Sequence, residues 1–318
     1  MILKTAGHQE RRRDAFGDGR LGRSHARQAR SIEDVFGWSR PFRPSLLPAI
    51  ALRLLEEAGA LERRGELFSS SVRYSVLDDQ IYVHSAFPTL APDSVFFGPD
   101  TYRFAALIRK TIDAERAIAR GCIVDVGCGA GAGGIVAARA ARGPSTLILT
   151  DINPTALRHA EINATLAGVE ASFRQGDLFA AIEDPIDLIV ANPPYLVDPE
   201  ARLYRHGGGK LGSGLSMRIV REGLSALAPG GALILYTGSC IVKGRDRLRE
   251  AIAIATRGAA VSYTYTELDP DVFGEELEMP ANAEVDRIAV VSAVFRSLRT
   301  PSAAGSTPSR AGMSRHSV

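Results

Sequence analysis

The chain has 318 residues, of which 45% are hydrophobic and 23% charged, so it can bury a full core as one large domain with an appendage or as two domains. No stretch approaches the roughly 20 consecutive apolar residues of a membrane span, and residues 1–30 contain no apolar block of signal-peptide length. The sequence therefore argues against a membrane protein and predicts a soluble protein of the cytoplasm.

The basic residues gather at the two ends of the chain. Residues 1–30 carry eight Lys and Arg against three acids, and residues 296–318 carry four Arg against none. Removing these from the totals of 38 and 36 leaves residues 31–295 with 26 basic and 33 acidic residues, a net charge of −7. Nucleic-acid enzymes usually show a basic face on the folded body itself. The body thus favours another class of substrate, while the arginine-rich ends leave nucleic acid open.

Neither end of the chain shows the apolar periodicity of a folded element. Residues 1–30 mix Arg, Gly, His and Gln, which predicts a disordered basic arm, and residues 298–318 predict a disordered tail. Cys122, Cys128 and Cys240 lack paired metal-ligand spacing, so they are expected to be reduced, small core residues and no metal site is predicted.

Residues 31–94 predict a small helix-plus-hairpin domain. A helix is expected to start at Pro48, because proline presets φ for the first helical turn. Residues 72–76 and 81–84 flank a polar turn and predict a β-hairpin, with His84 on its surface.

Residues 95–297 alternate between helix and strand patterns. After a helix at 102–119, the expected strands are 122–126, 146–150, a weaker one at Phe173, 188–191, 231–236, 259–266 and 287–295, and the expected helices between them are 132–142, 154–167, 215–227 and 244–257. This alternation implies a mostly parallel sheet covered by helices on both faces. The long link before the last strand would let that strand enter antiparallel.

A glycine-rich loop follows the first strand of this region and opens a helix. Gly127, Gly129 and Gly131 let the backbone approach a ligand where side chains would block it. Gly127, Gly129 and Ala132 also satisfy the spacing of a dinucleotide-binding loop. The loop alone therefore does not distinguish between the two kinds of cofactor.

Three aspartates stand at the ends of the first three strands. Asp151 is placed to accept both ribose hydroxyls of an adenosine ligand, and Asp177 follows the third strand. Asp125 can favour a cationic ligand or orient the loop amides, whereas it would repel a pyrophosphate. The acids favour a sulfonium cofactor over a nicotinamide one.

Asn192-Pro193-Pro194-Tyr195 follows the buried strand pattern of residues 186–191. Two consecutive prolines cannot continue a sheet ladder, so the chain must turn at the carboxyl end of the strand, where open α/β sheets place their ligands. The turn offers an amide side chain, a free carbonyl and an aromatic ring. These groups suit a planar substrate group that carries nitrogen.

Over residues 95–295 these motifs resemble the class I S-adenosylmethionine-dependent methyltransferases, and in particular the release-factor glutamine methyltransferases and related "methyltransferase small domain" enzymes. Pro99-Asp100-Thr101 and the segment from Ala160 to Ala164 echo further motifs of that family. Two features depart from it: residues 207–215 carry extra residues in the substrate loop, and the leading hairpin replaces an all-helical bundle. The resemblance implies an α/β fold with a seven-stranded, mostly parallel Rossmann-like sheet and an antiparallel last strand.

The resemblance also implies S-adenosyl-L-methionine as cofactor and assigns residues to it. The implied cofactor-binding residues are Thr101, Asp125, Gly127, Gly129, Gly131, Asp151, Asp177 and Asn192, and the implied catalytic residues are Asn192, Pro193 and Tyr195. The hypothesis is that the Asn192 side-chain oxygen and the Pro193 carbonyl accept hydrogen bonds from the two N–H groups of the nitrogen that receives the methyl group. Tyr195 would stack on the planar acceptor group and hold it in line.

Four functions remain open at this point. The first is N-methylation of a protein, with a glutamine side chain as the target and a translation factor among the candidate substrates. The second is methylation of adenine N6 or guanine N2 in RNA or DNA. A binding module without turnover and a nicotinamide oxidoreductase complete the set. The loop residues Arg202, Arg205, His206 and Lys210 are expected to be solvated and non-catalytic.

Overall fold

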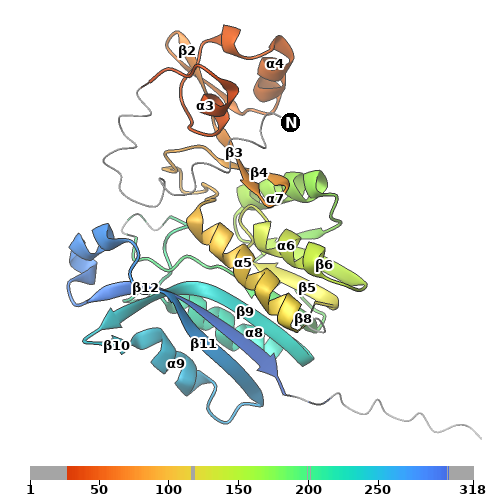
Figure 1. Cartoon of the computed structure of the whole chain (residues 1–318), viewed down its shortest axis with the longest axis vertical. Helices are drawn as coiled ribbons and strands as arrows, with labels where there is room; N and C mark the ends of the chain where they lie inside the picture. The colour runs from red at the N-terminus through yellow and green to blue at the C-terminus, as the bar shows by residue number, and fades with distance from the viewer. Residues whose placement is uncertain (1–26, 116–118, 199, 201, 299, 301–318) are drawn as a thin grey trace, which may run out of the picture.

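The computed structural model describes residues 27–115, 119–198, 200, 202–298 and 300. Most of the predicted arm and most of the predicted tail lie outside these ranges. In the view of Figure 1 a small leading part lies above a larger α/β part, and the chain passes from one to the other through the hairpin of β3 and β4.

The larger part is built on one eight-stranded sheet, in which seven strands follow the order β11-β12-β9-β8-β5-β6-β7 and the short β10 pairs with β9. The strands are β5 (Gly121–Val126), β6 (Ser145–Asp151), β7 (Ser172–Gln175), β8 (Ile186–Ala191), β9 (Leu227–Val242), β10 (Arg245–Asp246), β11 (Val261–Asp269) and β12 (Arg287–Ser297). Neighbours from β7 to β9 pair in parallel, whereas β12 pairs antiparallel with both β9 and β11. The predicted fold class, with its antiparallel last strand, is confirmed.

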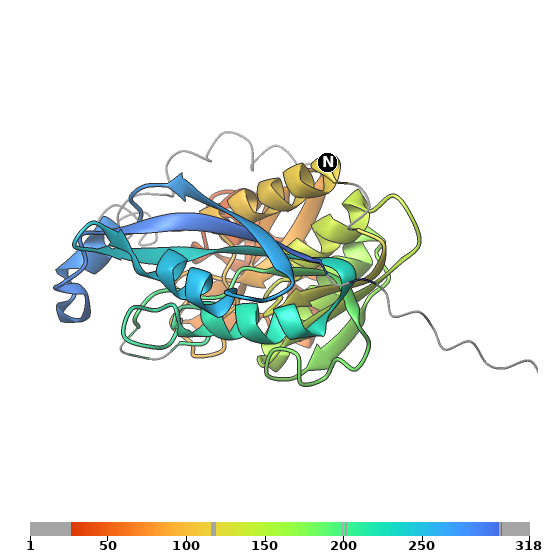
Figure 2. The same cartoon turned by 90° about the horizontal axis from the view of Figure 1, so that it is seen from below.

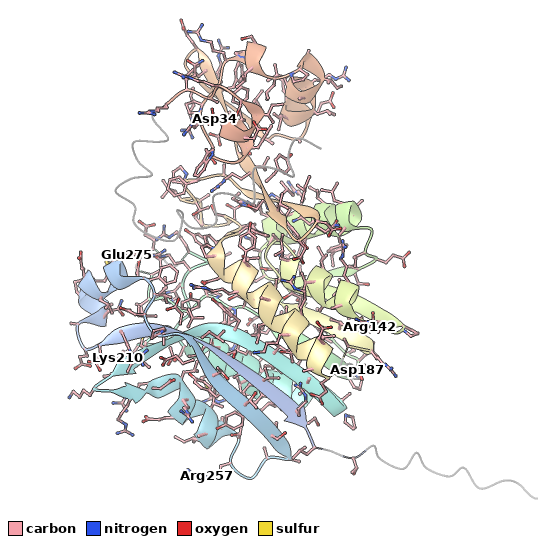
Figure 3. The ribbon with its side chains drawn as sticks, in the orientation of Figure 1. Asp34, Arg142, Asp187, Lys210, Arg257 and Glu275 are labelled. Atoms are coloured by element: carbon pink, nitrogen blue, oxygen red, sulfur yellow. The ribbon has the colours of Figure 1, made fainter. Side chains whose placement is uncertain are left out.

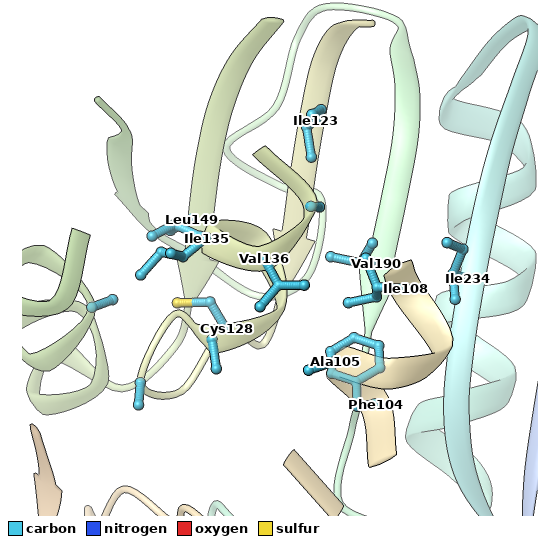
Figure 4. Packing of buried hydrophobic residues seen from close by; sticks show 14 of the residues in the cluster. Phe104, Ala105, Ile108, Ile123, Cys128, Ile135, Val136, Leu149, Val190 and Ile234 are labelled. Atoms are coloured by element: carbon cyan, nitrogen blue, oxygen red, sulfur yellow. The ribbon is translucent and has the colours of Figure 1, made fainter. Parts of the chain in front are cut away.

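Helices cover both faces of the sheet (Figure 2). The helices are α5 (Pro99–Ala114), α6 (Ala132–Ala140), α7 (Pro154–Ala167), α8 (Gly214–Ala226) and α9 (Arg247–Ala255). Apolar residues of α5, α6 and α7 form one buried cluster with the sheet, and those of α8 and α9 form a second. In Figure 4, Phe104 and Ile108 of α5 lie near Val136 of α6 and Val190 of β8. A parallel sheet covered in this way places the carboxyl ends of its strands together at one edge.

Strand β9 extends beyond the predicted 231–236 at both ends. At its C-terminal end the prediction stopped where the apolar run gave way to Thr237, Gly238 and Ser239. The two hydroxyl side chains are nonetheless buried. Thr237 Oγ1 lies 2.8 Å from Ser216 Oγ, and Ser239 donates to Asp246. Satisfied polar groups can continue a buried strand, and an apolar pattern alone does not reveal them.

The leading part has an apolar core of its own, formed by residues such as Val35, Phe42 and Leu55. Its elements are α3 (Ile32–Phe36), a 3-10 helix (Pro44–Leu46), α4 (Ala49–Glu57), β1 (Leu61–Arg64), β2 (Leu67–Ser70), β3 (Val72–Leu77) and β4 (Gln80–Ser85). The expected helix after Pro48 and the expected hairpin, formed by β3 and β4, are present. The hairpin of β1 and β2 and the short helix α3 were not predicted, because their apolar runs are too short to show a period.

His84 is a correction to the sequence analysis, which expected it on the surface of the hairpin. The side chain is only 2% exposed and stacks on Phe97, with ring centroids 5.2 Å apart. Its Nε2 lies 2.8 Å from Ser75 Oγ, and burial lowers its pKa to about 3. The hairpin packs on the larger part on this side, and alternation within one strand cannot show that a second layer covers it.

The hairpin of β3 and β4 joins the two parts of the chain. Leu77 and Tyr82 belong to the same buried cluster as α5, α6 and α7. The division of the chain into domains at residue 95 stays a prediction. Within the described residues, no helix is long and apolar enough to cross a membrane.

Candidate active site

A cavity of about 260 Å³ opens at the carboxyl ends of β5, β6 and β8. All eight predicted cofactor-binding residues except Gly131 line it, and so do the three predicted catalytic residues. The glycine loop and the Asn192-Pro193-Pro194-Tyr195 turn therefore face the same space, although about 60 residues separate them in the sequence.

The glycine loop turns sharply between β5 and α6. Gly127, Gly129 and Gly131 all have positive φ angles, of 67°, 53° and 76°. Gly131 is also in close contact, since a Cβ atom there would lie 3.1 Å from the Cβ of Ala160. This explains why Gly131 supports the loop from behind and does not line the cavity.

Asp125 and Asp151 hold this loop from opposite ends through backbone N–H groups. The buried Asp125 Oδ2 accepts from the Gly134 N–H at 2.7 Å, which fixes the first turn of α6. Asp151 Oδ2 accepts from the Gly129 N–H at 2.9 Å, and its Oδ1 accepts from the Asn153 N–H at the same distance. Burial raises the pKa of Asp125 to about 7 and raises the pKa of Asp151 as well.

Asp177 is placed differently from the other two acids. Its side chain is about half exposed at the cavity edge, and its two oxygens accept from Arg218 at 3.2 and 3.0 Å. The three acids thus share one cavity, but only Asp125 and Asp151 are engaged with the glycine loop.

The acceptor-side turn begins with Asn192 at the end of β8. Asn192 is half-buried and lines the cavity, whereas Tyr195 is 6% exposed. The Tyr195 hydroxyl donates to Asp100 Oδ2 at 2.5 Å. The ring lies against Gly238 of β9, where a Cβ atom would come 2.1 Å from Tyr195 Cδ2. Tyr195 is therefore fixed both at its hydroxyl and along its ring.

Asp100 is a site residue that the sequence analysis missed. The Pro99-Asp100-Thr101 motif carried the signal, but only Thr101 was assigned a role. Thr101 lines the cavity and accepts from the Gly98 N–H at 3.3 Å, which caps α5. Asp100 also lines the cavity, and it contacts Tyr195 directly.

The charged residues of the loop after Tyr195 are paired within the protein. The Arg202 guanidinium makes two hydrogen bonds to Asp198, at 2.9 and 2.7 Å, and the Arg202 backbone N–H makes a third at 3.0 Å; together they lower the pKa of Asp198 to about 2. Arg205 pairs with Glu276. Lys210, at the outer edge of the molecule in Figure 3, lies 3.5 Å from Glu284.

His206 lies in the same loop and is half-buried. Its Nδ1 accepts from the Asp198 N–H at 3.2 Å. This histidine was expected to be solvated, and the structure instead gives it a backbone partner. Its contact braces the loop next to Asp198.

The segment before α5 lies along the cavity and touches both of its sides. Phe96 stacks on Tyr204, with centroids 6.0 Å apart and ring planes within 13°. The Tyr204 hydroxyl donates to the Thr89 carbonyl at 2.8 Å. On the cofactor side, Asn153 Nδ2 donates to the Asp93 carbonyl at 2.8 Å. This segment therefore ties the loop after Tyr195 to the loop after β6.

Asn163 connects the glycine loop to the leading hairpin. Its side chain is fully buried in α7 and makes three hydrogen bonds. Oδ1 accepts from the Val83 N–H at 2.7 Å, while Nδ2 donates to the Val83 carbonyl at 3.0 Å and to the Ala130 carbonyl at 2.9 Å. One amide thus holds strand β4 and the loop that lines the cavity.

The cavity has a glycine loop and three carboxyl groups on one side and an Asn-Pro-Pro-Tyr turn on the other. A comparison with known protein families points to the same kind of site. Residues 104–253 match the family model described as methyltransferase small domain. This match supports the family expected from the sequence. The matched residues include the glycine loop and the Asn192-Pro193-Pro194-Tyr195 turn, whereas the lining residues between Ser94 and Thr101 and Phe273 lie outside the match.

Curated relatives of the chain include two release factor glutamine methyltransferases. The one from Deinococcus radiodurans is 36% identical over 183 residues, which cover 54% of this chain and 61% of the relative. The one from Rhodospirillum rubrum is 31% identical over 204 residues, which cover 59% of this chain and 57% of the relative. The chain therefore spans about three fifths of the length of these relatives.

Among solved structures, the chain is similar to the 16S rRNA N2 G1207 methyltransferase of T. thermophilus, determined in complex with AdoMet and guanosine. The two share 14% sequence identity, with a TM-score of 0.46, over 82% of this chain and 64% of the other.

Proposed function

We propose that the protein is an S-adenosylmethionine-dependent N-methyltransferase that acts on a planar amide nitrogen, with a protein glutamine side chain as the target. The observation that carries the proposal is the single cavity lined by both the glycine loop and the Asn192-Pro193-Pro194-Tyr195 turn. A cofactor and an acceptor bound on these two sides would meet within it.

The donor set of the cofactor side suits S-adenosylmethionine. Asp125, Asp151 and Asp177 all line the cavity, and a pyrophosphate there would face carboxylates. A sulfonium cofactor would instead be attracted by the same groups, with Asp151 placed for ribose hydroxyls and the loop backbone for close approach. When bound, S-adenosylmethionine supplies an electrophilic methyl group.

The chain's own task is to orient a poorly nucleophilic nitrogen. An amide lone pair is delocalised, so the acceptor must be held with that lone pair toward the methyl group. The Asn192 side-chain oxygen and the Pro193 carbonyl would accept hydrogen bonds from the two N–H groups of the amide, and the Tyr195 ring would flank the plane of the amide. No strong base is required, because the nitrogen becomes acidic only as it gains the methyl group.

Two observations favour a protein over a nucleic acid as substrate. Arg202 and Arg205, which lie closest in sequence to the acceptor turn, are engaged by Asp198 and Glu276 and are not free for phosphates. Two relatives that match over half of the chain or more are named release factor glutamine methyltransferase. The arginine-rich ends support the alternative, methylation of a nucleic-acid base.

The test is methyl transfer by the wild type and by an Asn192→Ala variant. Labelled S-adenosylmethionine and lysate from cells lacking the protein are incubated with each enzyme, and the label is divided into protease-sensitive and nuclease-sensitive fractions. We expect protease-sensitive label that falls about 100-fold or more with Asn192→Ala. The affinity for S-adenosylhomocysteine, measured by calorimetry, should remain close to that of the wild type.

Each alternative has its own outcome in this experiment. Nuclease-sensitive label would show that the substrate is a nucleic-acid base and not a protein. In that case, substrate binding should also depend steeply on salt concentration. An Asn192→Ala variant as active as the wild type would remove the acceptor turn from the mechanism. Binding of NAD in place of S-adenosylhomocysteine would indicate an oxidoreductase.

A further inference from the structure

A buried carboxyl group between the two sides of the cavity has no role in the reaction as proposed above. Asp100 stands in the first turn of α5 and is only 9% exposed. Its Oδ2 accepts from the Tyr195 hydroxyl at 2.5 Å, and its Oδ1 accepts from the Tyr236 hydroxyl at 2.8 Å. Both oxygens are thus used to hold tyrosine hydroxyls from two other elements, the acceptor turn and strand β9.

We propose that Asp100 is the positioning residue of the acceptor site, which fixes Tyr195 and thereby the Asn192-Pro193 acceptor groups before the acceptor arrives. Tyr236 completes the arrangement by holding the second oxygen of the carboxyl group. The kinetic part of this inference rests on the proposed methyl transfer, whereas the geometric part does not.

The contacts of Tyr195 show how an anchor on its hydroxyl reaches the acceptor groups. One part of the ring packs on Gly238, and Phe273 lies 6.1 Å from it, tilted by 59°. With one edge packed on Gly238, Phe273 beside it and its hydroxyl bound to Asp100, the ring is restrained from sliding along β9 and from turning outward. Asn192 and Pro193 stand three and two residues before Tyr195, in a turn stiffened by Pro193 and Pro194, so fixing the ring limits where the Pro193 carbonyl can lie.

The position of the carboxyl group favours a role in the site over a role in packing. Burying a carboxylate costs free energy that an apolar side chain of similar size would not cost, and ion pairs or hydrogen bonds offset it only in part. Arg103 is 3.8 Å from Asp100 Oδ1 and also pairs with Asp269 at 2.8 Å, so some positive charge is at hand. Because its burial costs free energy, the Asp100 carboxyl group at the cavity is better explained by the hydrogen bonds that it directs to the two tyrosines than by packing.

The kinetic test uses Asp100→Asn, Tyr195→Phe and the double variant. Loss of a hydrogen bond to a charged group should lower kcat by roughly ten- to a hundredfold in each single variant. The double variant should be no slower than the slower single variant, because both substitutions break the same contact. Independent, multiplying losses would overturn the inference.

Three controls separate a positioning role of Asp100 from a structural role and from direct binding of the cofactor. Asp113→Asn changes an exposed acid in the last turn of the same helix and should leave kcat and thermal unfolding unchanged. Tyr236→Phe leaves the contact between Tyr195 and Asp100 in place, so its loss of kcat should be smaller than that of Tyr195→Phe. The affinity of Asp100→Asn for S-adenosylhomocysteine should stay within about threefold of the wild type. A large loss of that affinity would mean that Asp100 binds the cofactor, which would overturn the inference.

A spectroscopic measurement tests the geometry without any substrate. Tyrosine hydroxyl protons bound to a buried carboxyl group exchange slowly and resonate downfield in proton NMR. The Tyr195 and Tyr236 hydroxyls should each give such a resonance in the wild type, Tyr195→Phe and Tyr236→Phe should each lose one, and Asp100→Asn should alter both. A resonance from the Tyr265 hydroxyl, which donates to Asp246, should be unchanged in all three variants. Absence of the Tyr195 and Tyr236 resonances from the wild type would overturn the inference, whereas a wild type that methylates neither fraction of the lysate would overturn only the proposed function.

Discussion

The two sides of the cavity are held together by different kinds of contact. On the cofactor side, carboxylates bind backbone N–H groups nearby in sequence, since Asp125 and Gly134 are 9 residues apart and Asp151 and Gly129 are 22 apart. On the acceptor side, side chains bind side chains over 95 residues, from Asp100 to Tyr195, and over 136, from Asp100 to Tyr236.

This difference implies that the two sides respond differently to substitution. The cofactor side is set by the turn between β5 and α6, with Asp151 of β6 and Asn163 of α7 bound to it, so it should tolerate changes outside these neighbouring elements. The acceptor side exists only when α5, the acceptor turn and β9 are all in place, so it should be sensitive to small shifts in any of them.

The largest expected effect on turnover comes from Gly238→Ala, a substitution in β9 that disturbs the acceptor side. The new Cβ would lie 2.1 Å from Tyr195 Cδ2, so the anchored ring must move. We expect turnover to fall by about 100-fold, and the free energy of unfolding to fall by roughly 1–3 kcal/mol. Affinity for S-adenosylhomocysteine should be retained. Gly274→Ala, where a Cβ would meet no atom within 4 Å, is the matched control.

A smaller effect, on the pH dependence of the free energy of unfolding, is expected from Asp125→Asn on the cofactor side. Burial raises the pKa of Asp125 from 3.8 to about 7, so between these pH values the folded protein holds a proton that the unfolded chain has released. Stability from this group is complete below about pH 4 and is lost as pH rises to about 7. Asn keeps an acceptor for the Gly134 N–H but does not titrate.

Urea unfolding at several pH values measures this effect. The free energy of unfolding of Asp125→Asn, relative to the wild type, should rise between pH 4 and pH 7 and then level off. A difference that stays constant with pH would mean that Asp125 keeps its ordinary pKa and remains ionised in the folded protein.

The smallest effect is expected from Arg218→Ala at the exposed edge of the cofactor side. The side chains of Arg218 and Asp177 are 46% and 54% exposed, so their ion pair is screened by water. The free energy of unfolding should change by less than about 0.5 kcal/mol. Affinity for S-adenosylhomocysteine should rise slightly, because the Asp177 carboxylate becomes free for the ligand. A marked loss of affinity would show that Arg218 itself contributes to the site.

The sequence predicted the cofactor side well because its signals are local. The glycines are required by the positive φ angles of the turn, and Asp125 and Asp151 stand at strand ends that apolar runs make visible. The same reasoning located the Asn192 turn, because two prolines end a strand unambiguously. The roles assigned to these residues in binding and catalysis stay predictions.

The partners of these residues could not be predicted in the same way. Nothing in the sequence near Tyr195 identifies Asp100 or Tyr236, since their meeting depends on the order of strands in the sheet. The burial of His84 likewise depends on a second layer that its own strand does not encode. Arg202, Arg205 and Lys210 were expected to be solvated, and their acidic partners became apparent only in three dimensions.

The three hydrogen bonds of Asn163 connect the glycine loop to a backbone N–H in the leading hairpin, outside the cavity. That N–H can report on the state of the loop. The same amide that receives the Val83 N–H also donates to Ala130 in the glycine loop. Any ligand that steadies the loop must also steady this amide, and with it the protection of the Val83 N–H against exchange with deuterium. The amide exchange rate of one residue in the leading hairpin can therefore register occupancy of the loop without a label, an acceptor or turnover.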